Sequence, residues 1–166
     1  MSNSLKAGRK AILKAWLIAG TLDMLSACVY YYIKTGNNPL KVFVYVAKVV
    51  LGNGSLANSL SGNDINMCAL GLIFHYCIAL GWTLVFFWLL PKIALLRQNK
   101  IVSGLIYGLF VWVSMNLVIV PLYRGVAWKF SSDEQMIVNM VILMLAIGLP
   151  ISIILNDDYK RRHEVQ

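Results

Sequence analysis

Apolar residues occur in four long segments along the chain, and shorter polar stretches separate these segments. The segments cover residues 15–33, 65–90, 101–123 and 135–155. The hydrocarbon core of a membrane is about 30 Å thick, and a helix rising about 1.5 Å per residue crosses it with about 20 apolar residues. Each segment is long enough for one crossing, so the pattern predicts four transmembrane helices.

A shorter apolar segment lies between the first two predicted spans. Pro39 suits the first turn of a helix over residues 39–51, in which Lys41, Tyr45 and Lys48 share one narrow face. Such a helix is about 20 Å long, which is too short to cross the hydrocarbon. We expect it to lie at the outer membrane interface, packed on the spans, and a re-entrant element that lines a cavity is the alternative.

The composition agrees with a membrane protein. Of the 166 residues, 59% are apolar and 13% are charged, with a mean hydropathy of +0.69, whereas soluble domains have about 45–50% apolar and about 25% charged residues. A chain this short cannot bury such a surplus, which argues against a soluble monomer, a disordered chain and a disulfide-rich secreted module. We expect one all-α domain over residues 1–166, an integral membrane four-helix bundle with the short helix between spans 1 and 2.

The formal net charge of +8 is distributed unevenly between the two sides of the membrane. Four spans place both termini on one side, where ten basic residues lie: Lys6, Arg9, Lys10, Lys14, Lys92, Arg97, Lys100, Lys160, Arg161 and Arg162. Five lie on the other side: Lys34, Lys41, Lys48, Arg124 and Lys129. The positive-inside rule then predicts cytoplasmic termini. The cytoplasmic basic segments meet anionic lipid headgroups, and we expect no nucleic-acid binding.

The sequence Leu25-Ser26-Ala27-Cys28 fits a bacterial lipobox, whose cysteine is lipidated after cleavage. Against cleavage, Asp23 interrupts the apolar run, and the run continues past Cys28 to Ile33 as a spanning helix would. We expect an uncleaved first span, and a processed lipobox is the alternative.

Asp23 lies near the middle of the first predicted span. A carboxyl group there costs at least about 2.5–3.5 kcal/mol, and ionisable groups inside a membrane are candidates for function. Ala19, Gly20 and Ala27 share its helical face, so another helix can approach closely. Asp23 is therefore either a neutral, hydrogen-bonded group that locks two helices together or a proton or cation site.

Three further polar residues fall within the other spans, at similar depth in the outer half of the membrane. These are His75, Asn116 and Asn139. Because buried polar groups must find partners in lipid, we expect them to hydrogen-bond with one another between helices. A proton relay through Asp23 and His75 is the alternative.

The sequence carries no recognised metal or catalytic motif. Only His75 lies within a span, His163 lies in the tail, and Cys28, Cys68 and Cys77 form no C-x-x-C pair. We expect no metal and no cofactor, although a homodimer could present two copies of His75. A disulfide between Cys28 and Cys68 is an open alternative. No G-x-S-x-G, P-loop or H-E-x-x-H motif is present, so catalysis by a known constellation is not supported.

Gly104 and Gly108 form a G-x-x-x-G motif on the third predicted span. Small residues at this spacing allow close helix contact. The motif serves either a contact within the bundle or a contact between copies in a homo-oligomer.

Several short motifs are similar to those of one protein family. They are His75 in the second span, Leu90-Pro91-Lys92-Ile93, Gly104-Leu105, Gly108, Val120-Pro121-Leu122 and Leu17-Ile18-Ala19-Gly20 in the first span. In these the chain resembles the YagU-like inner-membrane proteins of bacteria. The resemblance implies a helical protein of the bacterial inner membrane and implies no particular reaction.

Three classes of function follow. We expect a structural or accessory membrane protein in which Asp23, His75, Asn116 and Asn139 hold the helices together. The second class is a proton- or ion-linked channel or transporter that uses Asp23 and His75. The third is a membrane oxidoreductase or lipid-acting enzyme, for which only isolated polar residues speak.

Overall fold

The computed structural model describes residues 2–51, 64–124 and 133–164, and every regular element in these ranges is helical. Four helices are long and apolar enough to cross a membrane: Gly8–Thr35, Ile65–Leu89, Lys100–Leu122 and Glu134–His163. The predicted all-helical fold with four candidate spans is thereby confirmed.

The first candidate span belongs to α1 (Ser2–Thr35) and the second to α4 (Asp64–Leu89). Between them lies the short helix α2 (Lys41–Leu51), and α5 (Leu95–Gln98) follows α4. The third span consists of α6 (Lys100–Val113), the π-helix η1 (Ser114–Ile119) and α7 (Val120–Arg124). The fourth consists of α8 (Asp133–Leu143), the π-helix η2 (Met144–Gly148) and α9 (Leu149–Glu164).

Helix α1 ends at a glycine in the left-handed backbone conformation. Gly36 has φ 65°, and its N–H donates to the Tyr32 carbonyl at 2.8 Å, as in a C-terminal helix cap. Asn38 then accepts a hydrogen bond from the Leu40 N–H at 2.9 Å, which starts the turn into α2. The short helix therefore lies where one was predicted, beginning at Lys41.

Both π-helices precede a proline by two residues, Pro121 after η1 and Pro150 after η2. Proline has no N–H, and its ring clashes with the carbonyl four residues earlier in an α-helix. In the wider π turn that carbonyl is displaced from the ring. Backbone N–H groups there donate to the carbonyl five residues earlier, and not to the one four residues earlier. The Val120 N–H donates to Met115 O, and the Leu149 N–H donates to Met144 O.

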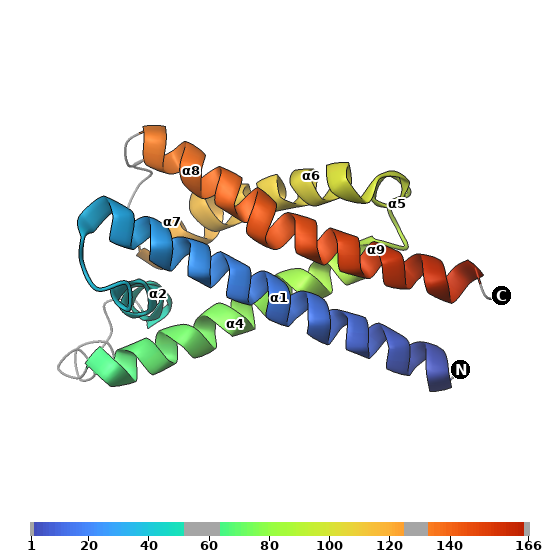
Figure 1. Cartoon of the computed structure of the whole chain (residues 1–166), viewed down its shortest axis with the longest axis horizontal. Coiled ribbons are helices and arrows are strands. Elements are labelled where there is room, and N and C mark those ends of the chain that lie inside the picture. Colours follow the sequence, from blue (N-terminus) through green and yellow to red (C-terminus); the bar gives the residue numbers. More distant parts are fainter. Residues whose placement is uncertain (1, 52–63, 125–132, 165–166) are drawn as a thin grey trace.

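Both termini and α5 lie at one end of the molecule, and α2 lies at the other end (Figure 1). In the same view α2 is seen nearly end-on, so its axis crosses the direction of the four long helices. Each long helix also turns large apolar side chains outward. Leu25, Ile73, Leu122 and Leu145 are each more than half exposed. In lipid such surface has no cost, because the tails are as apolar as leucine.

The core lies between the long helices and is continuous across all four. Its buried members are Ala11, Ala15, Ala19, Phe86, Leu90, Leu96, Tyr107, Val111, Trp112, Leu143, Ile147, Ile151 and Leu155. Three alanines from α1 let that helix approach its neighbours closely.

The G-x-x-x-G motif lies at the contact between the third and fourth helices. A Cβ atom at Gly108 would lie 2.4 Å from the Met144 Cα, and one at Gly148 would lie 2.1 Å from the Gly104 carbonyl oxygen. Backbone touches backbone there, so no side chain fits. Gly104 and Gly108 therefore serve an internal contact of the chain.

Candidate functional site

The first and second spans pack closely at Gly20. A Cβ atom added there would lie 3.1 Å from the Tyr76 ring and 3.4 Å from the Ala79 Cβ. Ala19 is fully buried, and Ala79 is nearly so. Small residues on both helices therefore bring polar groups of α1 and α4 within hydrogen-bonding distance.

Tyr76 joins the two helices through three contacts. The Trp16 Nε1–H donates to the Tyr76 carbonyl at 2.7 Å, and the Thr21 and Tyr76 hydroxyls lie 2.8 Å apart. The Trp16 and Tyr76 rings meet edge to face, with centroids 6.0 Å apart. Trp16 and Thr21 thus join α1 to α4 on either side of the close contact at Gly20. The sequence did not indicate this role for either residue.

His75 is bonded to α1. Its Nε2 lies 2.8 Å from the Gly20 carbonyl oxygen. Because a carbonyl only accepts hydrogen bonds, Nε2 must carry a proton, either in the neutral ring or in the imidazolium. In the neutral ring Nδ1 is then the acceptor nitrogen, and this is the nitrogen that gains a proton when the ring becomes charged.

Asp23 lies three residues after Gly20, near the middle of its span, and is half-buried. Among the described residues, neither an ion pair nor a hydrogen bond joins its carboxyl group to His75. The side chain has no hydrogen bond to any other residue that the structure describes. The structure thus binds His75 to the backbone of α1 three residues before Asp23 and leaves the carboxyl group of Asp23 without the hydrogen bond expected of a helix lock.

Asn116 and Asn139 form a separate contact between the third and fourth helices. The Asn116 amide donates to the Asn139 side-chain oxygen at 3.4 Å and to the Trp112 carbonyl at 3.0 Å. His75 does not join them, because its face of α4 is turned toward α1. The expected three-residue set is therefore divided between two helix pairs.

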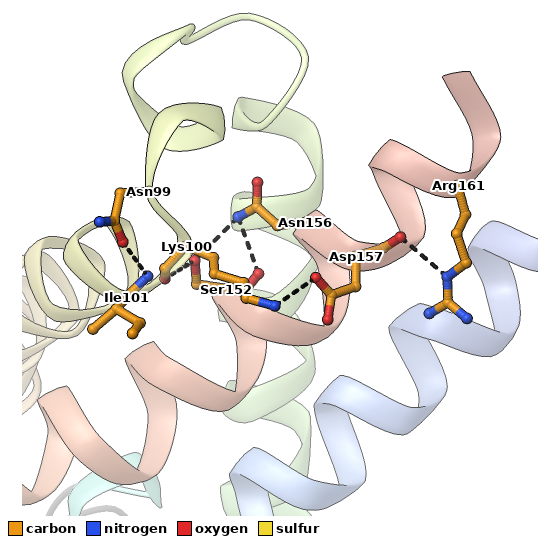
Figure 2. A network of polar contacts seen from close by, with 7 residues as sticks. All are labelled: Asn99, Lys100, Ile101, Ser152, Asn156, Asp157 and Arg161. Carbon is orange, nitrogen blue, oxygen red and sulfur yellow. Dashed lines mark hydrogen bonds and ion pairs between the residues drawn. The ribbon is translucent and has the colours of Figure 1, made fainter. Parts of the chain in front are cut away.

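A polar network at the end of the molecule that carries the termini was not predicted (Figure 2). The buried Ser152 donates to the Lys100 carbonyl at 2.8 Å, and the buried Asn156 donates to Ser152. Lys100 also forms an ion pair with Asp157, with 2.8 Å between Nζ and Oδ1. Asn99 caps α6, because its side-chain oxygen accepts hydrogen bonds from the backbone N–H groups of Ile101 and Val102. Two small polar residues four apart in an apolar helix were the signal for this network.

The basic tail of α9 is bound to the rest of the molecule next to this network. Arg162 forms an ion pair with the buried Asp158 at 2.8 Å, and its guanidinium lies 5.5 Å from the centre of the Phe87 ring. Arg97 donates to the Tyr159 hydroxyl at 3.2 Å. The ion pair lies within α9, and the contacts with Phe87 and Arg97 hold α9 against α4 and α5.

The described residues include no group of three or more His, Cys, Asp or Glu side chains that could hold a metal ion. The three cysteines are free thiols. Cys28 donates to the Pro39 carbonyl at 3.8 Å and Cys68 to the Leu40 carbonyl at 3.5 Å. Both thiols therefore contact the backbone just before α2.

Comparison with known proteins finds no matching family model, no matching curated protein and no matching solved structure.

Proposed function

We propose that this chain is an integral protein of the bacterial inner membrane with a structural or accessory role. In this proposal the four spans form a bundle, α2 lies at the outer interface, and both termini lie in the cytoplasm. The observation that carries the role is that polar side chains in the spans bond to neighbouring helices. His75 bonds to Gly20, Tyr107 to Trp82, and Asn116 to Asn139. Such bonds hold helices together where no water replaces a lost partner.

The membrane and the orientation rest on the sequence. The side that carries the termini has twice as many basic residues as the opposite side. The resemblance of short motifs to those of YagU-like proteins is what supports the proposed family and bacterial inner membrane. The proposed partner is the lipid bilayer, with anionic headgroups at the cytoplasmic basic segments.

Replacement of His75 tests the structural role. His75→Ala removes the bond to the Gly20 carbonyl, and hydrogen bonds between membrane helices contribute about 0.6 kcal/mol on average. We expect the purified variant to unfold at a lower temperature in detergent than the wild type. We also expect wild-type protein in liposomes to add no pH-driven ion flux to that of protein-free vesicles. Flux above this background would contradict a purely structural role.

A second candidate function is proton- or ion-linked transport. It is favoured by Asp23, because a carboxyl group near the middle of a span is costly and this one has no hydrogen bond within the described chain. His75, whose Nε2 is held by the Gly20 carbonyl three residues before Asp23, supplies an ionisable side chain on the neighbouring helix. In this second proposal Asp23 and His75 serve as successive proton sites.

Flux measurements in liposomes distinguish the two functions. If the pair moves protons, wild-type protein carries a pH-driven flux, and Asp23→Asn abolishes it because the amide cannot release a proton. Asp157→Asn is the matched control, since it makes the same chemical change at the ion pair with Lys100. Flux that survives Asp23→Asn in folded protein would reject the second function.

A further inference from the structure

Helix α2 is fixed rigidly against α4. A Cβ atom added to Gly71 would lie 1.8 Å from the Phe43 carbonyl oxygen, so the backbone of α2 rests directly on α4. Ala47, one turn further along, is fully buried. Cys28 and Cys68 donate to carbonyls just before α2, from α1 and α4 respectively. The buried face of α2, and therefore its opposite face, has a defined direction.

The opposite face of α2 is basic. Lys41, Tyr45 and Lys48 are exposed, and their spacing of four and three residues places them in one stripe along the helix. We call these three residues the basic stripe. Ala47 lies on the other side of the helix, so the basic stripe points away from the contact with α4.

The basic stripe lies at the end of the molecule away from the termini. There α2 crosses the direction of the long helices, as Figure 1 shows. Its 11 residues extend about 16 Å, too short to cross the hydrocarbon. A helix with one apolar and one basic face in this position lies in the plane of the membrane surface.

The lysines of the basic stripe lack acidic partners in the described chain. Lys34, at the same end, forms an ion pair with Glu134, whereas neither Lys41 nor Lys48 has an ion pair with a described residue. Lysines at this end are also not explained by the positive-inside rule, which favours basic residues at the end that carries the termini. These two exposed ammonium groups, without an ion-pair partner among the described residues, can attract anions from outside the chain.

We propose that the basic stripe binds the phosphate groups of anionic phospholipids in the leaflet opposite the termini. The binding rests on the membrane-spanning placement proposed for the chain. Lysine near an anionic surface strengthens binding by about fivefold, so the two lysines together supply roughly 25-fold. The lipid would hold α2 down on α4 from the outside, while the contact at Gly71 holds it from within.

The experiment compares full-length protein in vesicles of phosphatidylcholine and in vesicles that also contain phosphatidylglycerol. Hydrogen exchange of the α2 backbone amides, followed by mass spectrometry, reports how firmly α2 is held. We expect phosphatidylglycerol to slow exchange in wild-type α2 severalfold. Lys41→Gln with Lys48→Gln should remove most of this slowing, and Lys41→Arg with Lys48→Arg should keep it.

Two controls identify the source of the effect. Lys10→Gln with Lys14→Gln removes two exposed charges from the other end of the molecule and should leave the slowing at α2 intact. Inorganic phosphate added to phosphatidylcholine vesicles should not reproduce the slowing. An effect of free phosphate, an α2 exchange rate indifferent to lipid, or equal losses in both glutamine pairs would overturn lipid binding. Failure of the wild type to enter phosphatidylcholine vesicles would instead reject the membrane placement.

Discussion

Gly71 lies where the Phe43 carbonyl of α2 leaves no room for a side chain, with 1.8 Å between that oxygen and an added Cβ. Gly81, ten residues later in the same helix, has no atom within 4 Å of an added Cβ. The two glycines share a helix and a residue type and differ in what surrounds them. This difference allows the docking of α2 to be tested with a matched control.

Gly71→Ala should destabilise the protein by about 1–3 kcal/mol, because the added methyl forces α2 away from α4. The same variant should speed alkylation of Cys28 and Cys68, whose thiols bond at the start of α2. Gly81→Ala should be neutral or stabilise by about 0.5–1 kcal/mol, since alanine favours a helix. Thermal unfolding in detergent and the rate of maleimide labelling measure both effects. Equal stability of the two variants would contradict the docking contact.

Individual residues were predicted better than their partners. Asp23 and His75 are recognisable because ionisable groups rarely occur in apolar spans. The bond of His75 to the Gly20 carbonyl was not expected, because depth counted along each helix assumes that the helices stand parallel from known boundaries. Helix α1 begins well before its apolar segment, and the contacts at Gly20 and Tyr76 fix how α1 and α4 cross. Asn116 and Asn139 do meet, at the similar depth that the counting predicted.

At the scale of elements, the first residue of α6 is attached to α9 by two bonds, one buried and one exposed. Ser152 is fully buried and donates to the Lys100 carbonyl, whereas the ion pair of Lys100 with Asp157 is about 40% exposed on each side. A buried hydrogen bond that loses a partner leaves a desolvated group, and an exposed ion pair returns to water.

Ser152→Ala should therefore cost more than Lys100→Gln. We expect about 1–3 kcal/mol for Ser152→Ala, which leaves the Lys100 carbonyl and the Asn156 amide short of a partner. Lys100→Gln should cost only about 0.2–1 kcal/mol, and less at high salt. Chemical unfolding of both variants measures the difference. The opposite order would show that the ion pair, and not the serine, attaches α6 to α9.

Hydropathy predicted which elements exist and predicted their ends less well. Backbone hydrogen bonds of a helix close within the helix, so α1 and α9 continue past their apolar segments into the polar stretches at Ser2 and Glu164. The π-helices also escaped prediction, because hydropathy has no signal for them. Pro121 and Pro150 were the only local indication that the hydrogen-bonding pattern changes.

At the scale of the whole molecule, the distributions of charge and of apolar surface both fit four helices that span a membrane. Both termini and α5 lie at one end, which carries most of the basic residues (Figure 1). Apolar side chains cover the outside of the long helices between the two ends. The four spans follow from sequence length and hydropathy alone. Their order in space depends on which glycines and alanines touch, and a single sequence does not show those contacts in advance.

Cysteine labelling in cells tests the membrane-spanning placement and its orientation most directly. With Cys28, Cys68 and Cys77 replaced by serine, a single cysteine is placed at exposed Asn37, before α2, or at exposed Gln98, in α5. We predict that Asn37→Cys reacts with a membrane-impermeant maleimide in intact cells and that Gln98→Cys reacts only after the inner membrane is permeabilised. Equal labelling of both positions in intact cells would contradict the four-span placement, and the reversed pattern would contradict the cytoplasmic location of the termini.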